Sequence, residues 1–376
     1  MVQQHVRGAQ ALAAGIAALP DTRSSAAYTQ AAWRFLNNDR VRLSELAKPL
    51  LSAVPELLDA HCERYGLVMH DWSRLNFGRH TSKTDRLKMT HKSDVGYELQ
   101  SSVLVSDASG KPLVPVVHNL VNDTQVHTTM HARPRAHQNH LDELSERIGW
   151  LEARGWDKPL VHIVDREGDS VAHWREWSAQ GSRFLVRAKD DPQVCFEGIP
   201  VKPKKLAERL SYQNAGDVLY HGHTAHQTIA QAKVLIKRTA KPKRAVDGKR
   251  IAPVAGEPLA LRLVVSRICD AQGQVLAQWL LLTNVSDEVD AVTIARWYYY
   301  RWQIESMFKL LKSAGQQVED WLQDDALAIA KRLVVASCAC VLVWQLAAAT
   351  SPQALDIQHF LVRLSGRQTK RRRPVT

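Results

Sequence analysis

The order of apolar runs is the feature that most limits the folds open to this chain. Three strand-like runs follow one another, and after them the pattern changes to helix, strand, helix and strand. The early runs lie at residues 65–70, 97–106 and 112–120, the helical segments at 137–154 and 170–180, and the later strands at 159–164 and 183–188. A turn at 107–110 joins the second run to the third, so we expect an antiparallel meander. This order predicts an α/β domain built on a mixed sheet flanked by helices.

Two of these strands are followed directly by an aspartate, Asp71 after the first and Asp165 after the fourth. The order of elements is that of a ribonuclease-H-like fold, in which the first and fourth strands are neighbours. If Asp71 ends the first strand, the two carboxylates meet at one edge of the sheet, where sites of α/β proteins collect. Two alternatives stay open. Both residues could be ordinary strand-ending aspartates, and Asp94 or Asp107 could replace Asp71, although neither follows an apolar run.

Residues 298–312 read YYYRWQIESMFKLLK, and we predict that they form one helix. Its polar residues Tyr298, Arg301, Glu305, Lys309 and Lys312 fall on one arc at about 100° per residue. A cationic stripe with one carboxylate suits a metal ligand set among phosphate-binding groups. The alternative is a solvated helix face stabilised by pairs such as Glu305 with Lys309.

The spacing Tyr-x2-Arg-x3-Glu-x6-Lys resembles the signature of the insertion-sequence-four family, a group of DDE transposases. Other stretches resemble that family as well: AAWRFLNNDRV at 31–41, DREGD at 165–169, RFLVRAK at 183–189 and WLLLT at 279–283. Asp71, in MHDW, is a less distinctive match. The resemblance implies that Asp71, Asp165 and Glu305 are the catalytic carboxylates and that they hold two Mg²⁺ ions, which Mn²⁺ can replace.

The resemblance also implies a set of DNA contacts. We expect them at Tyr298, Arg301, Lys309, Lys312, Trp279, Arg187 and Lys189. Of these, Tyr298, Arg301 and Lys312 would hold the phosphate beside the cut, a task that suits a bidentate arginine. Trp279 would stack on a base flipped from the transposon end. A tryptophan packed in the core remains the alternative for Trp279.

The implied function is cut-and-paste DNA transposition by end nicking, hairpin formation and strand transfer. The implied partners are the terminal inverted repeats, target DNA and a second copy of the chain in a synaptic homodimer, in a bacterial cytoplasm. Two other functions stay open. One is a regulator that binds transposon ends without cutting, and the other is a ribonuclease-H-like nuclease without strand transfer.

Composition agrees with a nucleic-acid partner. The 376 residues carry 50 Lys and Arg against 38 Asp and Glu, a formal net charge of +12, and this excess favours a polyanion. Five cysteines form no CxxC pair, which fits a reduced compartment better than a disulfide scaffold. The N-terminus has no signal-peptide pattern. The apolar segment 333–349 is interrupted by Ser337 and Gln345, so we expect a buried or interface helix and no membrane partner.

We expect five segments along the chain. They are an N-terminal helical region at 1–60, core residues 61–189, a basic β-rich insertion at 190–276, core residues 277–349 and a basic tail at 350–376. Between Lys233 and Arg250, eight basic residues accompany one acidic residue, which indicates phosphate binding or a solvated loop. Helix, turn and helix near residues 25–58 could read DNA or form a plain hairpin. Members of the resembling family usually extend further at both ends, so we expect shortened termini and weak pairing of two DNA ends.

Overall fold

The computed structural model describes residues 25–89, 91, 93–220, 222–240, 255–313 and 315–364. Three predictions concern residues outside these ranges and stay predictions. They are the first part of the N-terminal helical region, residues 1–24, most of the basic run between Lys233 and Arg250, and the basic end of the chain after 364.

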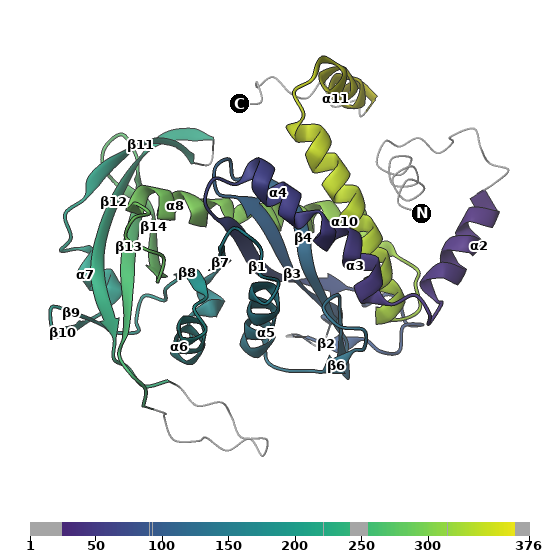
Figure 1. Cartoon of the computed structure of the whole chain (residues 1–376), viewed down its shortest axis with the longest axis horizontal. Coiled ribbons are helices and arrows are strands. Elements are labelled where there is room, and N and C mark those ends of the chain that lie inside the picture. Colours follow the sequence, from purple (N-terminus) through teal and green to yellow (C-terminus); the bar gives the residue numbers. More distant parts are fainter. Residues whose placement is uncertain are drawn as a thin grey trace.

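A mixed sheet forms the centre of the molecule (Figure 1). Its core strands are β1 (Gly66–Asn76), β3 (Val95–Ser106), β4 (Pro112–Val121), β7 (Leu160–Val164) and β8 (Arg183–Arg187). They lie in the order β4-β3-β1-β7-β8. The pairs β1–β3 and β3–β4 are antiparallel, whereas β1–β7 and β7–β8 are parallel. This is the ribonuclease-H-like order, so the predicted fold class is confirmed. Short strands β2 (Leu87–Lys88), β5 (Gln125–Thr128) and β6 (Arg135–Ala136) complete that side of the sheet.

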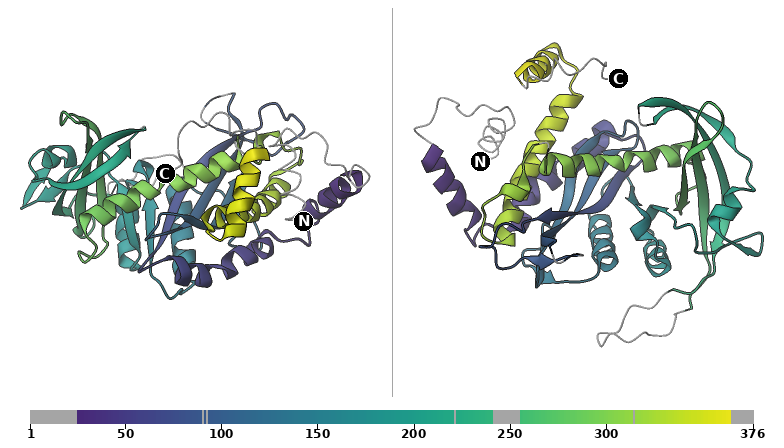
Figure 2. Two further views of the ribbon diagram at one scale, coloured as in Figure 1. Left: turned by 90° about the horizontal axis from the view of Figure 1, so that it is seen from above. Right: turned by 180° about the vertical axis from the view of Figure 1, so that it is seen from behind.

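Helices cover both faces of the sheet (Figures 1 and 2). One face carries α5 (His140–Glu152) and α6 (Val171–Ala179), which bury leucine, isoleucine and tryptophan side chains against β7 and β8. The opposite face carries α8 (Ala291–Tyr300), α9 (Trp302–Leu311) and α10 (Ala326–Ala348). Helix α3 (Leu43–Ser52) contacts α10 and β4, and Leu58 of α4 (Val54–His61) lies against Gly66 at the start of β1. Helix α2 (Ser25–Leu36) contacts α10. Burial of both faces explains why the central strands read as continuous apolar runs.

The predicted β-rich insertion extends the same sheet. It comprises β9 (Val194–Phe196), β10 (Ile199–Val201), α7 (Pro203–Ala207), β11 (Gln213–Tyr220), β12 (His223–Ile236) and β13 (Leu259–Cys269). The chain then returns through β14 (Val275–Thr283), which pairs with β13 on one side and with β8 on the other. The insertion is therefore joined to the core by continuous backbone hydrogen bonding between strands.

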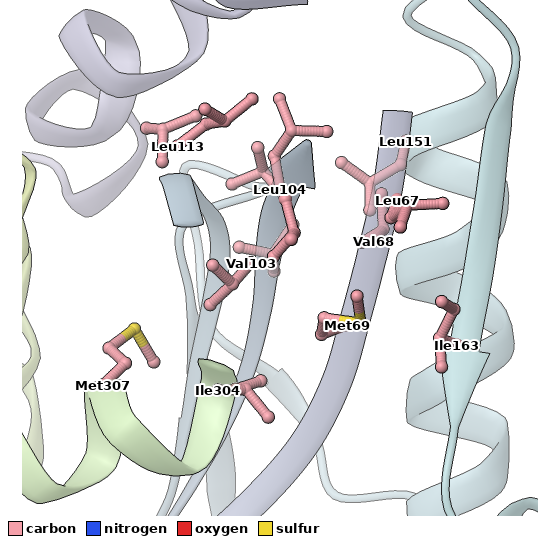
Figure 3. Close-up of a cluster of buried hydrophobic side chains, with 14 of the residues drawn as sticks. Leu67, Val68, Met69, Val103, Leu104, Leu113, Leu151, Ile163, Ile304 and Met307 are labelled. Carbon is pink, nitrogen blue, oxygen red and sulfur yellow. The ribbon is translucent and has the colours of Figure 1, made fainter. Parts of the chain in front are cut away.

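The packing of α9 sets the direction of its polar side chains. Ile304 and Met307 are fully buried, and Figure 3 shows them directed toward the apolar side chains of β1 and β3, among them Met69 and Val103. A helix held by two buried side chains on one side cannot rotate without exposing them. Glu305, between these two positions, is only partly buried and lies at the border of this interface.

Two local predictions are wrong. Asp71 does not end its strand, because antiparallel pairing of β1 with β3 continues as far as Asn76 opposite Gly96. Only the parallel pairing with β7 stops near Asp71, at Met69 opposite Ile163.

Residues 298–312 do not form one regular helix, since α8 ends and α9 begins at Arg301. The Arg301 amide donates to the carbonyl of Tyr298, a tightened turn that interrupts the α-helical bonding.

Helix α10 matches the predicted buried or interface helix. By length and composition it could cross a membrane, but 67% of its most apolar window is buried inside the protein, as in the core helix of a globular domain. The predicted basic tail begins with a helix, α11 (Pro352–Leu364), whose Gln358 amide donates to the carbonyls of Leu346 and Ala349 near the end of α10.

Candidate active site

The two central parallel strands carry Asp71 and Asp165. Asp71 lies on β1 two residues beyond the last parallel pair, and Asp165 directly follows β7. The Asp165 side chain accepts a hydrogen bond of 2.8 Å from the Glu167 amide and caps the short 3₁₀ helix η1 (Arg166–Gly168). Because β1 and β7 are neighbours and run in the same direction, the two aspartates share one edge of the sheet.

Glu305 reaches the same edge from α9 and is linked to Asp71 through Arg301. The Arg301 guanidinium donates from Nη1 to Asp71 Oδ2 at 2.9 Å and from Nη2 to Glu305 Oε1 at 2.6 Å. The side chains of Asp71 and Arg301 are only 16% and 12% exposed, so this pair is shielded from solvent, whereas Glu305 is 34% exposed. A buried charge requires a partner of opposite sign, and Arg301 serves both carboxylates.

The electrostatics show that the three carboxylates share one neighbourhood. The pKa of Asp71 is raised to about 6, mainly by burial; the negative charges of Asp165 and Glu305 contribute to the rise, whereas Arg301 opposes it. Burial and the charge of Asp165 also raise the pKa of Glu167. A bound cation relieves the repulsion between carboxylates that lie close together.

The donor set fits magnesium in its chemistry, because Mg²⁺ prefers carboxylate oxygens. In the positions that the structure gives, no three His, Cys, Asp or Glu side chains among the described residues are grouped closely enough to hold a metal ion. The Arg301 guanidinium, between Asp71 and Glu305, accounts for part of this spacing. Asp71, Asp165 and Glu305 could therefore serve as ligands only after these side chains rearrange.

The aromatic and cationic residues expected to bind DNA flank the carboxylates. Tyr298 is buried, which raises its pKa, while the nearby Arg301 and Arg187, the latter at the end of β8, act to lower it. Trp279 on β14 is half-buried, and its ring centroid lies 6.0 Å from that of Tyr298 and 6.4 Å from that of the exposed Tyr299. Trp279 is thus part of an aromatic group beside the site.

The three lysines expected to bind DNA occupy different environments. Lys309 is exposed on α9, one turn beyond Glu305. Lys189 is exposed after β8, and its amide donates to Asp169 at 2.7 Å. Lys312 is already engaged, because its ammonium donates to the Arg74 carbonyl at 2.6 Å and lies 3.1 Å from Glu319. Within the described ranges, the ammonium groups of Lys309 and Lys189 form no ion pair, whereas Lys312 ties α9 to β1.

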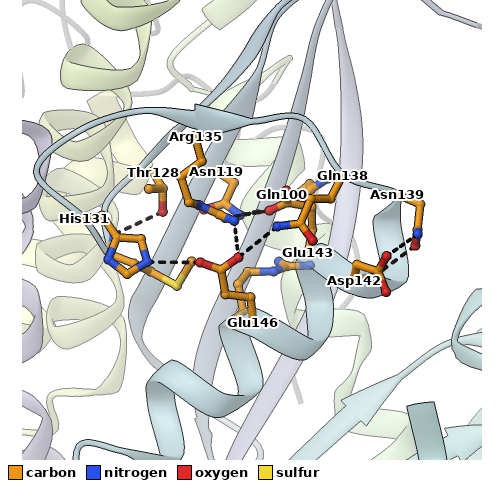
Figure 4. A network of polar contacts seen from close by, with 12 residues as sticks. Gln100, Asn119, Thr128, His131, Arg135, Gln138, Asn139, Asp142, Glu143 and Glu146 are labelled. Atoms are coloured by element: carbon orange, nitrogen blue, oxygen red, sulfur yellow. Dashed lines mark hydrogen bonds and ion pairs between the residues drawn. The ribbon is translucent and has the colours of Figure 1, made fainter. Parts of the chain in front are cut away.

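Sequence reasoning missed a polar group behind Asp71. The ring of His140 packs on Trp72 at 4.7 Å between centroids, and its Nε2 lies 2.7 Å from Glu98 Oε2. Arg147 is fully buried below, where burial lowers its pKa to about 10 while Glu143, Glu98 and Asp71 oppose this shift. The group continues into the network of Figure 4, where Arg135 bridges Glu143 and Glu146 on α5. These residues carry no recognisable spacing, so only their three-dimensional proximity reveals them.

No family model matches the chain. Among solved structures, the fold is distantly similar to a piggyBac transposase in a synaptic complex with hairpin DNA, with a TM-score of 0.36 and 8% sequence identity. The match covers 90% of this chain and 62% of that protein.

Proposed function

We propose that this chain is a DNA transposase that acts by metal-dependent phosphoryl transfer. One observation carries the proposal: Asp71, Asp165 and Glu305, from three separate segments of a ribonuclease-H-like fold, share one edge of the sheet, where the charges of Asp165 and Glu305 act on Asp71. The basic balance of the chain supports DNA as the substrate.

Two Mg²⁺ ions, which Mn²⁺ can replace, would supply Lewis-acid chemistry that activates the attacking oxygen and stabilises the leaving oxygen. Asp71, Asp165 and Glu305 are the residues that would hold them. No covalent protein nucleophile is required for such a transfer. The protein would contribute a fixed carboxylate arrangement and groups that grip the phosphate.

The neighbouring side chains have distinct tasks in this proposal. Arg301 presents a forked donor to a phosphate that approaches the carboxylates, and Arg187 with Tyr298 offers a second pair of donors beside it. Lys309 and Lys189 add positive charge at the rim. Trp279 and Tyr299 provide aromatic faces on which an unpaired base can stack.

We propose cut-and-paste transposition of an insertion sequence as the specific reaction, in the bacterial cytoplasm. Water nicks the element's end, the freed 3′-hydroxyl attacks the opposite strand to form a hairpin, and the reopened end joins target DNA. The partners are the terminal inverted repeats, target DNA and a second copy of the chain. This detail rests on the residue spacings from Tyr298 to Lys312 and on DREGD at 165–169.

A cleavage assay tests the proposal. The substrate is a labelled duplex that carries the inverted repeat flanking the coding region, and the control duplex has that terminal sequence scrambled. With Mg²⁺ we expect a nick, a hairpin and a joined product on the first duplex alone. With Ca²⁺ in place of Mg²⁺ we expect binding without cleavage.

The other functions give different products in the same assay. A nick without hairpin or joining on either duplex identifies a nuclease. A stable complex with the repeat that is never cut identifies an end-binding regulator. Either result refutes the proposed transposase.

A further inference from the structure

The strand that carries Asp71 loses one of its two neighbouring strands just before this residue. Beyond Met69 the parallel pairing of β1 with β7 has ended, and in the described part of the sheet the rest of β1 pairs with β3 alone. Asp165 leaves the sheet at the same level, where η1 begins. No strand pairing therefore fixes the separation of these two aspartates, although Mg²⁺ tolerates little departure from octahedral geometry. Other contacts must hold this separation.

Trp72 makes such a contact on the α5 side of the strand. Successive side chains of a strand point to opposite faces, so Asp71 meets Arg301 on one face whereas Trp72 points to α5 on the other. The ring of His140, the first residue of α5, packs on the Trp72 ring with centroids 4.7 Å apart and planes at 51°. The Trp72 amide donates to Asp71 Oδ1 at 2.8 Å, so a shift of Trp72 also moves a donor that orients this carboxylate.

The His140 ring is itself fixed from two directions. Its Nε2 lies 2.7 Å from Oε2 of the buried Glu98 on β3, and Oε1 of Glu98 accepts a further bond of 2.9 Å from Gln100. Asn139 caps α5 by accepting hydrogen bonds from two amides of the first turn, which sets where the helix begins. His140 thus links the start of α5 to β3 and to β1 at once.

His140 also lies near η1, on the other side of the separation. The hydrogen bond with Glu98 raises the pKa of His140 against the effect of burial, and the charge of Glu167 contributes to the rise. Glu167 is the middle residue of η1, which Asp165 caps. His140 therefore stands beside both segments that carry the proposed ligands, the β1 segment of Asp71 and the turn of Asp165.

We propose that His140 is a positioning residue for the metal site: its ring, held by Glu98, supports Trp72 and keeps Asp71 at the separation from Asp165 that the metal ions require. The inference rests on the proposed function, and it assigns a task to a residue outside the carboxylate set. If His140 only adds to folding stability, the two experiments below give different results.

Binding of Mn²⁺ to the DNA-free protein, measured by electron paramagnetic resonance of the free ion, tests the role without any catalysis. His140→Ala should weaken binding by about tenfold or more, as expected when a residue that orients a metal ligand is lost. His140→Phe keeps a ring on Trp72 and should retain most of the affinity. His140→Gln keeps an amide donor for Glu98 but no ring, and should resemble His140→Ala. His173→Ala is the matched control, because it removes a histidine contact of 3.1 Å with Asp142 elsewhere on α5.

Nicking of the end-containing duplex with Mg²⁺ separates positioning from stability. His140→Ala should lower the nicking rate at saturating duplex by about tenfold or more, while the Kd for the duplex in Ca²⁺ stays the same. His173→Ala should lower the melting temperature and leave both the nicking rate and the Mn²⁺ affinity unchanged. A purely stabilising role would make the His140 variants behave like this control.

Wild-type Mn²⁺ affinity and nicking in His140→Ala and His140→Gln would overturn the inference and leave the proposed function in place. If His140→Ala does not fold, His140→Gln and Trp72→Leu test the same contact, because each removes one of the two rings. A wild-type protein that neither binds Mn²⁺ saturably nor nicks the duplex would refute the proposed function, and the inference with it.

Discussion

Arg301 Nη1 lies 2.9 Å from Asp71 Oδ2, a pairing between residues 230 positions apart in the chain. The same guanidinium reaches Glu305, so one cation joins the central strand to the helix that follows the insertion. In the proposed enzyme these two carboxylates are metal ligands. Arg301 therefore stands where the charge of a metal ion would otherwise be needed, and a phosphate that attracts Arg301 would release both carboxylates.

Arg301→Gln should increase the affinity of the DNA-free protein for Mn²⁺ by about tenfold, because removal of one positive charge leaves Asp71 and Glu305 uncompensated. Electron paramagnetic resonance of free Mn²⁺ measures this affinity without any catalysis. Arg296→Gln, an exposed arginine on α8, is the control and should leave it unchanged. Weaker Mn²⁺ binding by Arg301→Gln would show that the guanidinium supports the metal site.

Asp71→Asn, Asp165→Asn and Glu305→Gln should each lower cleavage by about a thousandfold or more while duplex binding in Ca²⁺ changes little. Each substitution removes a proposed ligand, and phosphoryl transfer depends on the charge that the ligand holds in place. Asp94→Asn is the control, since Asp94 pairs with Arg74 outside the carboxylate group. Near-normal cutting by Asp71→Asn would mean that the first carboxylate has been misassigned.

Trp279→Ala should leave first-strand nicking intact and reduce hairpin formation by about tenfold or more. Stacking of one base on an aromatic ring is worth about 1–3 kcal/mol, and nicking does not require a flipped base. Trp302→Ala, 62% exposed on α9, is the control. If Trp279 is instead a packing residue, its loss should cost about 3–5 kcal/mol of folding free energy. A large fall in melting temperature, with both reactions reduced together, would identify that role.

The pair of His140 and Glu98 should make folding stability depend on pH. The hydrogen bond with Glu98 raises the pKa of His140, whereas the pKa of Glu98 is lowered by His140 despite the opposing effect of burial. A raised histidine pKa stabilises the fold fully below the unfolded value of about 6.5, and this contribution is lost as the pH rises through the folded value. The Glu98 contribution is present above its unfolded pKa of about 4.3 and is lost as the pH falls through its lowered folded value.

Urea midpoints at pH 5.5 and pH 8.5 check this expectation. The difference in midpoint between wild type and His140→Asn should be larger at pH 5.5 than at pH 8.5. The comparison removes the effects of other titrating groups, such as the buried His118, which are common to both proteins. An equal difference at both pH values would contradict the assigned ion pair.

The fold was predictable because its signals are local. Apolar runs bounded by turn residues identified β1, β3, β4, β7 and β8, and their order specified the ribonuclease-H-like class. The place of Asp165 was also predictable, since the apolar run before it ends where β7 ends. The extent of β1 was not, because its half-buried continuation beyond His70 depends on pairing with β3.

The candidate site was only partly predictable. The sequence spacing predicted that Arg301 and Glu305 lie within one helical turn of each other. It did not predict that Asp71 also bonds to the Arg301 guanidinium. The engagement of Lys312 with Arg74 and the contacts of His140 with Trp72 and Glu98 depend on distant segments. Such contacts result from tertiary packing, and the spacing of residues in the sequence does not predict them.

The junction between β14 and β8 has a consequence for synthesis on the ribosome. The Thr283 hydroxyl donates a hydrogen bond to the Phe184 carbonyl, 99 residues earlier in the chain. During synthesis, β8 therefore has no β14 partner until almost a hundred further residues have been added. At about 5–20 residues per second this delay is about 5–20 s. Glu305 leaves the ribosome later still. In the proposed enzyme, a nascent chain thus carries both aspartates before the third carboxylate, and it can cut DNA only after Glu305 has been added.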